Sequence, residues 1–236
     1  MSRLQQLFQQ KQKDILNIYF TAGYPTLDST VDIIQLLDQS GVDLIEIGMP
    51  YSDPLADGPT IQQSGMKALE NGMTLPFLFE QIEQARQKTD IPLVMMGYFN
   101  QVMQYGERAF FEQCKAVGID GLILPDLPLD VYEQDYQQIL HELGLDITFL
   151  ITPQTSESRI QKIDELSTGF IYMVSNASIT GAKRDISEQQ IAYFNRIEQM
   201  QLAHPRLIGF GISNRSTFET ACRYASGAII GSAFIK

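Results

Sequence analysis

The residues best suited to chemistry lie in one stretch of the 236-residue chain, from Val42 to Gln63, which reads VDLIEIGMPYSDPLADGPTIQQ. Glu46 lies between Ile45 and Ile47, inside an apolar run whose length suits a buried strand. A carboxylate in such a strand loses its water, so it must be paired, or its pKa must rise until it is protonated. A carboxyl that is protonated near neutral pH can donate a proton in catalysis. The alternatives for Glu46 are a buried ion pair and a carboxylate at a solvated strand end.

A polar loop follows this strand and contains Ser52, Asp53 and Asp57. Three prolines stiffen the loop, and a long, rigid, polar loop after a buried strand is typical of a binding site. Asp57 is therefore a second candidate for acid–base chemistry. Structural alternatives exist for both aspartates, because Asp53 suits a turn and Asp57 precedes Gly58-Pro59, where it suits the N-cap of a helix.

The composition is that of an ordinary globular protein, with 44% hydrophobic and 19% charged residues, and it predicts a single domain over residues 1–236. The net charge of −11 argues against binding to nucleic acids and to anionic membranes, because both favour basic surfaces. The N-terminus has no signal-peptide pattern and no run is long enough for a transmembrane helix. We therefore expect a cytoplasmic protein.

The cysteines and histidines indicate neither a disulfide framework nor a metal site. Cys114 and Cys222 lie far apart in helix-like segments, so we expect them to be buried free thiols. His141 and His204 lie beside neither a cysteine nor a paired carboxylate, so the spacing predicts no zinc site and no nucleophile–histidine arrangement.

Short apolar runs alternate with amphipathic segments along the whole chain. Alternating strands and helices predict a parallel sheet, and eight such strands fit a (β/α)8 TIM barrel. The alternative is a doubly wound open sheet, but the segment after the first strand, 21–25, lacks the glycine pattern of that fold. A short amphipathic helix over 3–12 is expected to cover one end of the barrel. The predicted strands are Ile15–Phe20, Val42–Gly48, Pro92–Met96, Gly121–Leu124, Asp146–Ile151, Gly169–Val174, Leu207–Phe210 and Gly227–Ile230. The predicted helices between them are Ser29–Gln39, Leu75–Lys88, Glu107–Val117, Asp130–Leu143, Glu157–Leu166, Glu188–Gln199 and Thr217–Tyr224.

The active site of such a barrel lies at the carboxyl ends of the strands. The loop with Asp57 follows the second strand, and the sixth strand carries Tyr172. A polar loop of small residues over 175–182 comes next, and its composition is that of a mobile lid. The strand ends therefore predict one site on this face.

The last two strands each run into a glycine turn and a predicted helix start, at 209–213 (GFGIS) and 231–234 (GSAF). Backbone N–H groups at such a turn bind phosphate without a lysine, and phosphate sites recur after the last two strands of this architecture. Ser213 and Ser232 add hydroxyl donors. The alternatives are tight turns and helix caps.

Segments spread over the whole chain, in order and spacing, resemble the α subunit of tryptophan synthase. The most specific is IEIGMPYSDPLADGPTIQ at 45–62. The others are YFTAGYP (19–25), LPDLP (124–128), IYMVS (171–175), TGA (180–182), GFGIS (209–213) and GSAF (231–234). The resemblance implies a lyase of tryptophan biosynthesis that cleaves indole-3-glycerol phosphate to indole and D-glyceraldehyde 3-phosphate.

The resemblance also assigns roles to individual residues. It implies that Glu46 is the general acid–base, which protonates indole C3 and helps to deprotonate the glycerol hydroxyl. Asp57 then hydrogen-bonds the indole N–H and stabilises positive charge on the ring. Tyr19 and Tyr172 line the indole pocket. The other substrate-binding residues, most of them around the phosphate, are Thr180, Gly181, Gly211, Ser213, Gly231 and Ser232.

The same resemblance implies no cofactor in this chain and a partner, the pyridoxal-phosphate (PLP) β subunit, in an α2β2 heterotetramer. The loop around Asp53, Asp126 and the lid at Thr180 are expected to couple the subunits. Family members continue into a long helix after GSAF, so we expect the eighth barrel helix to be absent from this chain, which ends at Lys236.

Two other functions stay open at this point. One is a different phosphosugar barrel enzyme, although an indole-glycerol-phosphate synthase needs a lysine on an early strand, and here Lys11 and Lys13 precede the first strand. The other is a non-catalytic subunit that only activates its β partner.

Overall fold

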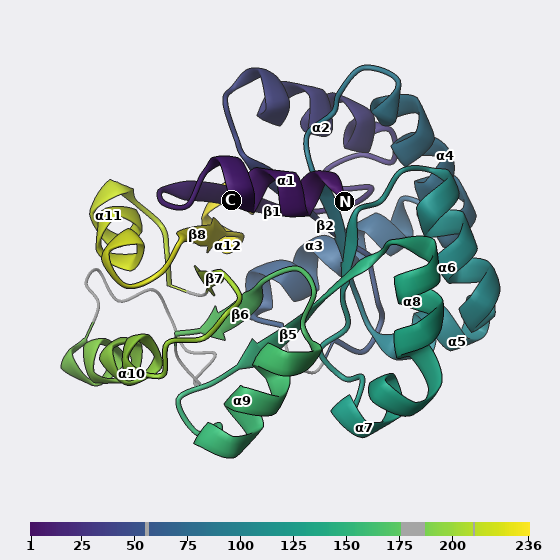
Figure 1. Ribbon diagram of the computed structural model, residues 1–236. Coiled ribbons are helices and arrows are strands. Elements are labelled where there is room, and N and C mark those ends of the chain that lie inside the picture. The colour runs from purple at the N-terminus through teal and green to yellow at the C-terminus, as the bar shows by residue number, and fades with distance from the viewer. Residues whose placement is uncertain (55–56, 176–186, 210) are drawn as a thin grey trace.

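The computed structural model describes residues 1–54, 57–175, 187–209 and 211–236. Eight parallel strands close into a barrel in chain order, with β1 paired to both β2 and β8 (Figure 1). The predicted (β/α)8 barrel is confirmed, while the single domain over 1–236 stays a prediction. The strands are β1 (Ile15–Thr21), β2 (Leu44–Gly48), β3 (Leu93–Met96), β4 (Gly121–Ile123), β5 (Asp146–Ile151), β6 (Ile171–Val174), β7 (Arg206–Gly209) and β8 (Gly227–Ile230).

Helices fill the connections between the strands and form an outer ring around the barrel (Figure 1). Most of the predicted helices are within a residue or two of the observed bounds, but α5 has no counterpart in the prediction, and for α3 and α12 only a helix start was predicted, without a range. The segment predicted as one helix over 130–143 is interrupted by a π-helical turn, η1, which separates α7 from α8. The helices are α1 (Arg3–Gln10), α2 (Ser29–Gln39), α3 (Pro59–Glu70), α4 (Leu75–Arg86), α5 (Phe99–Tyr105), α6 (Glu107–Ala116), α7 (Leu129–Val131), η1 (Tyr132–Tyr136), α8 (Gln137–Leu143), α9 (Glu157–Leu166), α10 (Glu188–Gln199), α11 (Arg215–Tyr224) and α12 (Ser232–Ile235).

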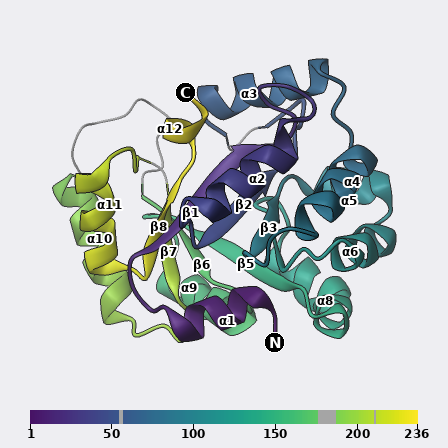
Figure 2. The same cartoon turned by 90° about the horizontal axis from the view of Figure 1, so that it is seen from above.

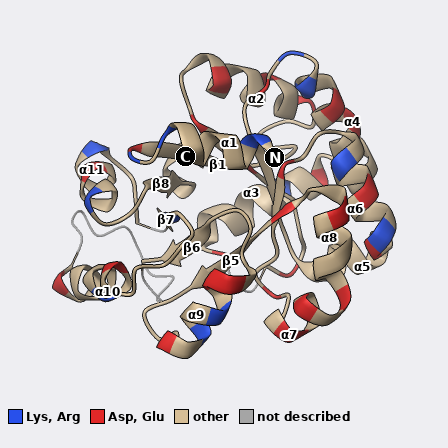
Figure 3. Cartoon of the chain, viewed as in Figure 1, with Lys and Arg blue, Asp and Glu red and all other residues tan. Residues whose placement is uncertain are grey.

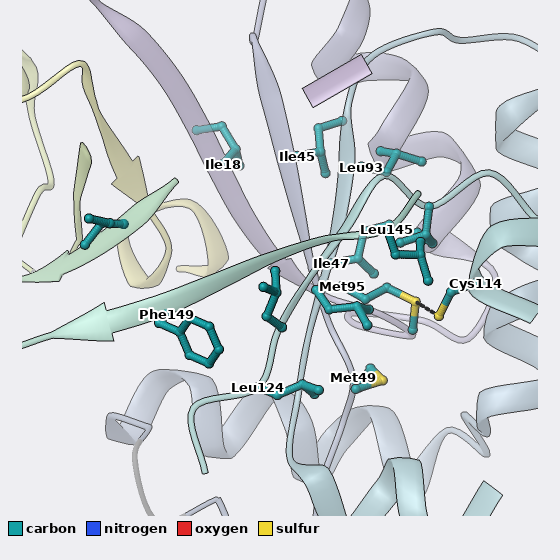
Figure 4. Close-up of a cluster of buried hydrophobic side chains, with 14 of the residues drawn as sticks. Ile18, Ile45, Ile47, Met49, Leu93, Met95, Cys114, Leu124, Leu145 and Phe149 are labelled. Carbon is teal, nitrogen blue, oxygen red and sulfur yellow. Dashed lines mark hydrogen bonds between the residues drawn. The ribbon is translucent and has the colours of Figure 1, made fainter. Parts of the chain in front are cut away.

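The strands bury side chains on both faces, as parallel strands covered by helices do. On the outer face, residues such as Ile45 and Met95 pack against the helices, and Cys114 Sγ on α6 lies 3.9 Å from Met95 Sδ (Figure 4). On the inner face, a second cluster that includes Leu44 fills the barrel. Because side chains alternate along a strand, Glu46 shares the inner face with Leu44.

Helix α1 closes the end of the barrel at which the strands begin, as predicted (Figure 2). Leu4 is fully buried and belongs to the inner cluster. Gly121 and Gly169 make room for it, since β-carbons at these positions would lie 3.4 and 3.1 Å from Leu4 Cδ2. Gln5 Nε2 donates a hydrogen bond to Asp146 Oδ1 over 2.7 Å and fixes the helix to β5. The interior is therefore closed at this end.

Residues of both charges, Lys and Arg as well as Asp and Glu, occur along the ring of helices (Figure 3). Cys114 and Cys222 are buried free thiols, as predicted. In the part of the chain that the structure describes, no helix is both long enough and apolar enough to cross a bilayer.

We expect Leu4→Ala to lower the free energy of unfolding by about 2–5 kcal/mol, because it empties a closed apolar site. The matched control is Leu36→Ala on α2, where the side chain is 61% exposed and the expected loss is below about 0.5 kcal/mol. Urea denaturation followed by circular dichroism measures both losses. Similar losses in the two variants would contradict the closing role of α1.

Candidate active site

Glu46 lies in the middle of β2 and is 1% exposed. Its register partners are Tyr19 on β1 and Val94 on β3. Asn17 Nδ2 donates a hydrogen bond to Glu46 Oε2 over 3.1 Å, and no ion pair to Glu46 exists among the described residues. Burial raises the pKa of Glu46 to about 8, the charge of Asp57 adds to the rise, and the Asn17 hydrogen bond opposes it. At neutral pH the carboxyl is therefore mostly protonated.

Asp57 is half-buried in the loop between β2 and α3. The Tyr98 hydroxyl donates a hydrogen bond to Asp57 Oδ2 over 3.3 Å. The N-cap of α3 is Gly58, so the side chain of Asp57 does not cap this helix. Burial raises the pKa of Asp57 to about 6, and the hydrogen bond from Tyr98 opposes the rise. The pKa of Glu46 therefore lies above that of Asp57, so Glu46 keeps its proton to a higher pH than Asp57 does.

Tyr19 on β1 and Tyr172 on β6 are buried in the inner cluster, on strands that β7 and β8 separate. Burial raises the pKa of both hydroxyls, and the charges of Glu46 and Asp57 add to the rise, so all four groups share one electrostatic environment. Each ring needs a glycine on the next strand. A β-carbon at Gly48 would lie 2.1 Å from the Tyr19 hydroxyl, and one at Gly209 would lie 2.3 Å from the Tyr172 hydroxyl.

The residues predicted to hold phosphate lie at the ends of β7 and β8. Gly211 has a φ of +80°, a conformation that favours glycine. A β-carbon added at Gly211 would lie 3.9 Å from the Oγ of Ser175, which directly follows β6. Ser213 is exposed and precedes Asn214, the residue that caps α11, so its hydroxyl is not the helix cap.

The backbone at the end of β8 lies against the ring of Tyr19. A β-carbon at Gly231 would lie 3.5 Å from Tyr19 Cδ1, and Ser232 begins α12 directly after it. Thr180 and Gly181 lie outside the described residues. The structure therefore brings Gly231 and Tyr19 together, while Gly211 and Ser213 lie at the neighbouring strand end.

Two polar residues that contact the carboxyls are not among the predicted site residues, although Tyr98 follows the third predicted strand at the active face. Asn17 binds Glu46, and its sequence signal is the same as that of Glu46, a polar residue inside an apolar strand. Tyr98 binds Asp57, and its ring stacks on Tyr51 with centroids 5.0 Å apart. Nothing in the sequence marks Tyr98 as a partner of Asp57, because the two residues lie on loops after different strands. Among the described residues, no three His, Cys, Asp or Glu side chains gather into a group that could hold a metal ion.

The family model described as "Tryptophan synthase alpha chain" matches residues 4–236. The chain belongs to the tryptophan synthase alpha chain family. The tryptophan synthase alpha chain of Flavobacterium johnsoniae is 57% identical over 236 residues, which are 100% of this chain and 93% of that protein. A Mycobacterium tuberculosis tryptophan synthase structure has a TM-score of 0.90 at 34% identity and covers 99% of this chain and 90% of its own. A tryptophan synthase complex from Pyrococcus furiosus has a TM-score of 0.86 at 34% identity, and the match covers 94% of this chain and 89% of the chain in that structure.

Membership in the tryptophan synthase alpha chain family gives the chain its function. It acts as a tryptophan synthase α subunit, a lyase subunit of tryptophan biosynthesis. The resemblance drawn from the sequence is therefore confirmed, and the alternative of a different phosphosugar barrel enzyme is wrong.

We expect Glu46→Gln to be more stable relative to the wild type at pH 9 than at pH 5. The pKa of Glu46 rises from 4.5 to about 8 on folding, so its stabilising contribution is complete below pH 4.5 and is lost as the pH rises through 8. Glutamine has no such dependence. Urea denaturation at both pH values measures the difference, which should reach a few kcal/mol. Glu83→Gln on the exposed side of α4 is the control, and an equal pH trend in both variants would show that Glu46 titrates normally.

We expect Gly209→Ala to lower kcat/KM by roughly 10²-fold, because its methyl group must displace the Tyr172 ring from the pocket. Gly65→Ala on α3 is the control. A β-carbon at Gly65 would lie 3.8 Å from its nearest neighbour, the backbone oxygen of Tyr51, which is an ordinary contact distance. Steady-state turnover of indole-3-glycerol phosphate measures both variants. Wild-type kinetics for Gly209→Ala would show that the position of the ring is not important.

Proposed function

We propose that the α subunit reaction proceeds on Glu46 and Asp57 by retro-aldol cleavage of indole-3-glycerol phosphate. The observation that carries this proposal is the different surroundings of the two carboxyls: Glu46 is buried inside β2 beside Asn17, and Asp57 is half-buried in the loop after β2 beside Tyr98. Burial raises the pKa of Glu46 to about 8 and that of Asp57 to about 6. A neutral carboxyl can give a proton, and an ionised carboxyl can stabilise a cation. The reaction needs the proton at C3 of the indole ring and the negative charge at the ring nitrogen, two atoms that C2 separates.

In the first step Glu46 gives its proton to C3 of the indole ring. The ring nitrogen then carries the positive charge, and its N–H donates a hydrogen bond to the Asp57 carboxylate. In the second step the bond between C3 and the glycerol carbon breaks, and its electron pair returns to the ring. The glycerol hydroxyl becomes the aldehyde carbonyl as its proton passes to the Glu46 carboxylate. Glu46 thus ends protonated, and the products are indole and D-glyceraldehyde 3-phosphate.

The other predicted residues bind the two ends of the substrate. Tyr19 and Tyr172 present buried rings to the indole, and their neutral hydroxyls cannot compete with Glu46 for protons. The backbone near Gly211, together with Ser213 and the 231–232 turn, holds the phosphate, and Thr180 and Gly181 contribute from the sixth loop. The protonated indole ring accepts the electrons of the broken bond, so this step uses no cofactor of the chain.

We also propose that the chain works in an α2β2 heterotetramer and passes indole to a PLP-dependent β subunit in the cytoplasm. The similar Pyrococcus furiosus structure is that of a tryptophan synthase complex, which supports a partner for this chain. The loop around Asp53 and the Asp126 region lie at the open end of the barrel, where a partner can receive the product. Asp126 Oδ1 accepts a hydrogen bond from the Phe99 N–H over 2.8 Å and so ties this region to α5.

Glu46→Gln tests the acid–base role directly. We expect it to keep substrate affinity and lose roughly 10²–10⁴-fold in kcat, because the amide can neither give nor take the proton. Indole release is measured with the β subunit present, so that a weak isolated α subunit is not misinterpreted. Undiminished turnover would refute the role of Glu46. If the wild type itself released no indole while still stimulating the β reaction of indole with serine, the activator alternative would hold.

Asp57→Asn tests the stabilisation of charge on the ring. The neutral amide keeps the shape and the hydrogen bond from Tyr98 but loses the negative charge. We expect a fall in kcat on the order of 10²-fold, as for the loss of one electrostatic group at a reacting centre. Asp32→Asn is the control, because Asp32 is an exposed aspartate on α2 that has no role in the proposed mechanism or in the contact with the β subunit. Equal rates for the two variants in the indole assay would remove Asp57 from the mechanism.

A further inference from the structure

The amide of Asn17 is a polar group on the inner face of the barrel that the proposed mechanism does not use. Asn17 lies on β1 two residues before Tyr19 and is completely buried. Its register partners are Leu44 on β2 and Ile229 on β8, both in the apolar inner cluster. An amide in such surroundings destabilises the fold unless its polar atoms are hydrogen-bonded. Its position therefore requires an explanation.

The hydrogen bonds of this amide are only half satisfied. Its Nδ2 donates to Glu46 Oε2 over 3.1 Å, and both side chains are buried. Its Oδ1 is buried and has no hydrogen-bond partner in the described structure. The amide thus offers a donor to Glu46 and keeps an acceptor unused, at a site where an unpaired buried acceptor is unfavourable.

The unused acceptor has a purpose once Glu46 changes its protonation state. An ionised carboxylate only accepts hydrogen bonds, whereas a protonated carboxyl also has an O–H to donate. The two ends of an asparagine amide have nearly the same shape, so a half-turn of the group replaces the donor by the acceptor. Oδ1 then lies where Nδ2 was and accepts the Glu46 O–H.

We propose that Asn17 is a positioning residue for Glu46, whose amide donates to the carboxylate and, after a half-turn, accepts from the protonated carboxyl. This inference rests on the proposed role of Glu46, which must give a proton in one step and take one in the next. A partner with only donors would leave the O–H of the protonated carboxyl without an acceptor. The amide holds the side chain in one orientation through both.

The titratable groups that face Glu46 act on it differently from the amide of Asn17, which does not titrate. They are Asp57 in the loop after β2, Tyr19 on β1 and Tyr172 on β6. Asp57 raises the pKa of Glu46 through its charge, whereas Asn17 lowers it through the hydrogen bond. The partner on β3, Val94, is apolar. Asn17 is therefore the group whose removal alters both the orientation and the ionisation of Glu46.

Asn17→Leu removes the hydrogen bonds and keeps an apolar side chain of similar size. We expect kcat to fall on the order of ten-fold, with KM nearly unchanged, because the orientation of the acid is lost. The alkaline limb of the kcat–pH profile should move to higher pH by about 0.5–1 unit. The hydrogen bond from Asn17 to the ionised carboxylate is stronger than the one to the protonated carboxyl, so losing both raises the pKa of Glu46. Ile229→Val is the control for packing in the same layer and should leave the profile in place.

A double variant separates action through Glu46 from a structural effect. In the Glu46→Gln background, Asn17→Leu should change the remaining rate by less than about two-fold, because the group it positions is already gone. All proteins are assayed with the β subunit present, after circular dichroism has shown that each is folded. If Asn17→Leu does not fold, Asn17→Ala is measured in the same way.

The outcomes distinguish this inference from the proposed function. If Glu46→Gln loses turnover while Asn17→Leu keeps the wild-type kcat and pH profile, Asn17 has no positioning role. A fall in kcat without movement of the alkaline limb, or one of equal size in the Glu46→Gln background, shows a structural effect and also overturns the inference. If Glu46→Gln keeps full turnover, the role of Glu46 itself fails.

Discussion

Closure of the sheet into a barrel is the constraint on which the rest of the structure depends. Eight parallel strands paired in a ring have no edge, and the alternation of side chains turns every second residue toward the interior. A polar group in that interior finds its partners among inward residues of other strands and strand-end loops. Glu46 and Asn17 are such a pair, and the register of β1 against β2 brings them together. The chemistry of the site follows from this register.

The barrel could be predicted from the sequence because each strand is an apolar run bounded by helical segments. The runs Asp146–Ile151 and Gly227–Ile230 have the predicted bounds. Glu46 was visible for the same reason, since an acid interrupts an apolar run. Asn17 interrupts the run ILNIYF in the same way. The role of Asn17, however, depends on which side chains of the next strand lie near it. That depends on the register between the two strands, which a single sequence does not reveal.

Other features depended on contacts that a linear pattern does not show. Gly48 and Gly209 look like turn residues at strand ends, whereas they leave room for tyrosine rings from the preceding strands. The polar sequence around Asp57 suggests a carboxylate in water, whereas the structure half-buries this side chain. Burial raises the pKa of Asp57 to about 6. The π-helical turn at 132–136 likewise has no signal in the helical periodicity.

The closed end of the barrel has a consequence for hydrogen isotopes. Leu4 closes the interior where the strands begin, so among the described residues water approaches Glu46 from the other end of the barrel. A substrate bound at that end would lie between the carboxyl and the solvent. In heavy water, Glu46 would then carry whichever isotope it acquired before the substrate bound. The label found in the indole would record the solvent that the enzyme met before binding and not the solvent present during bond cleavage.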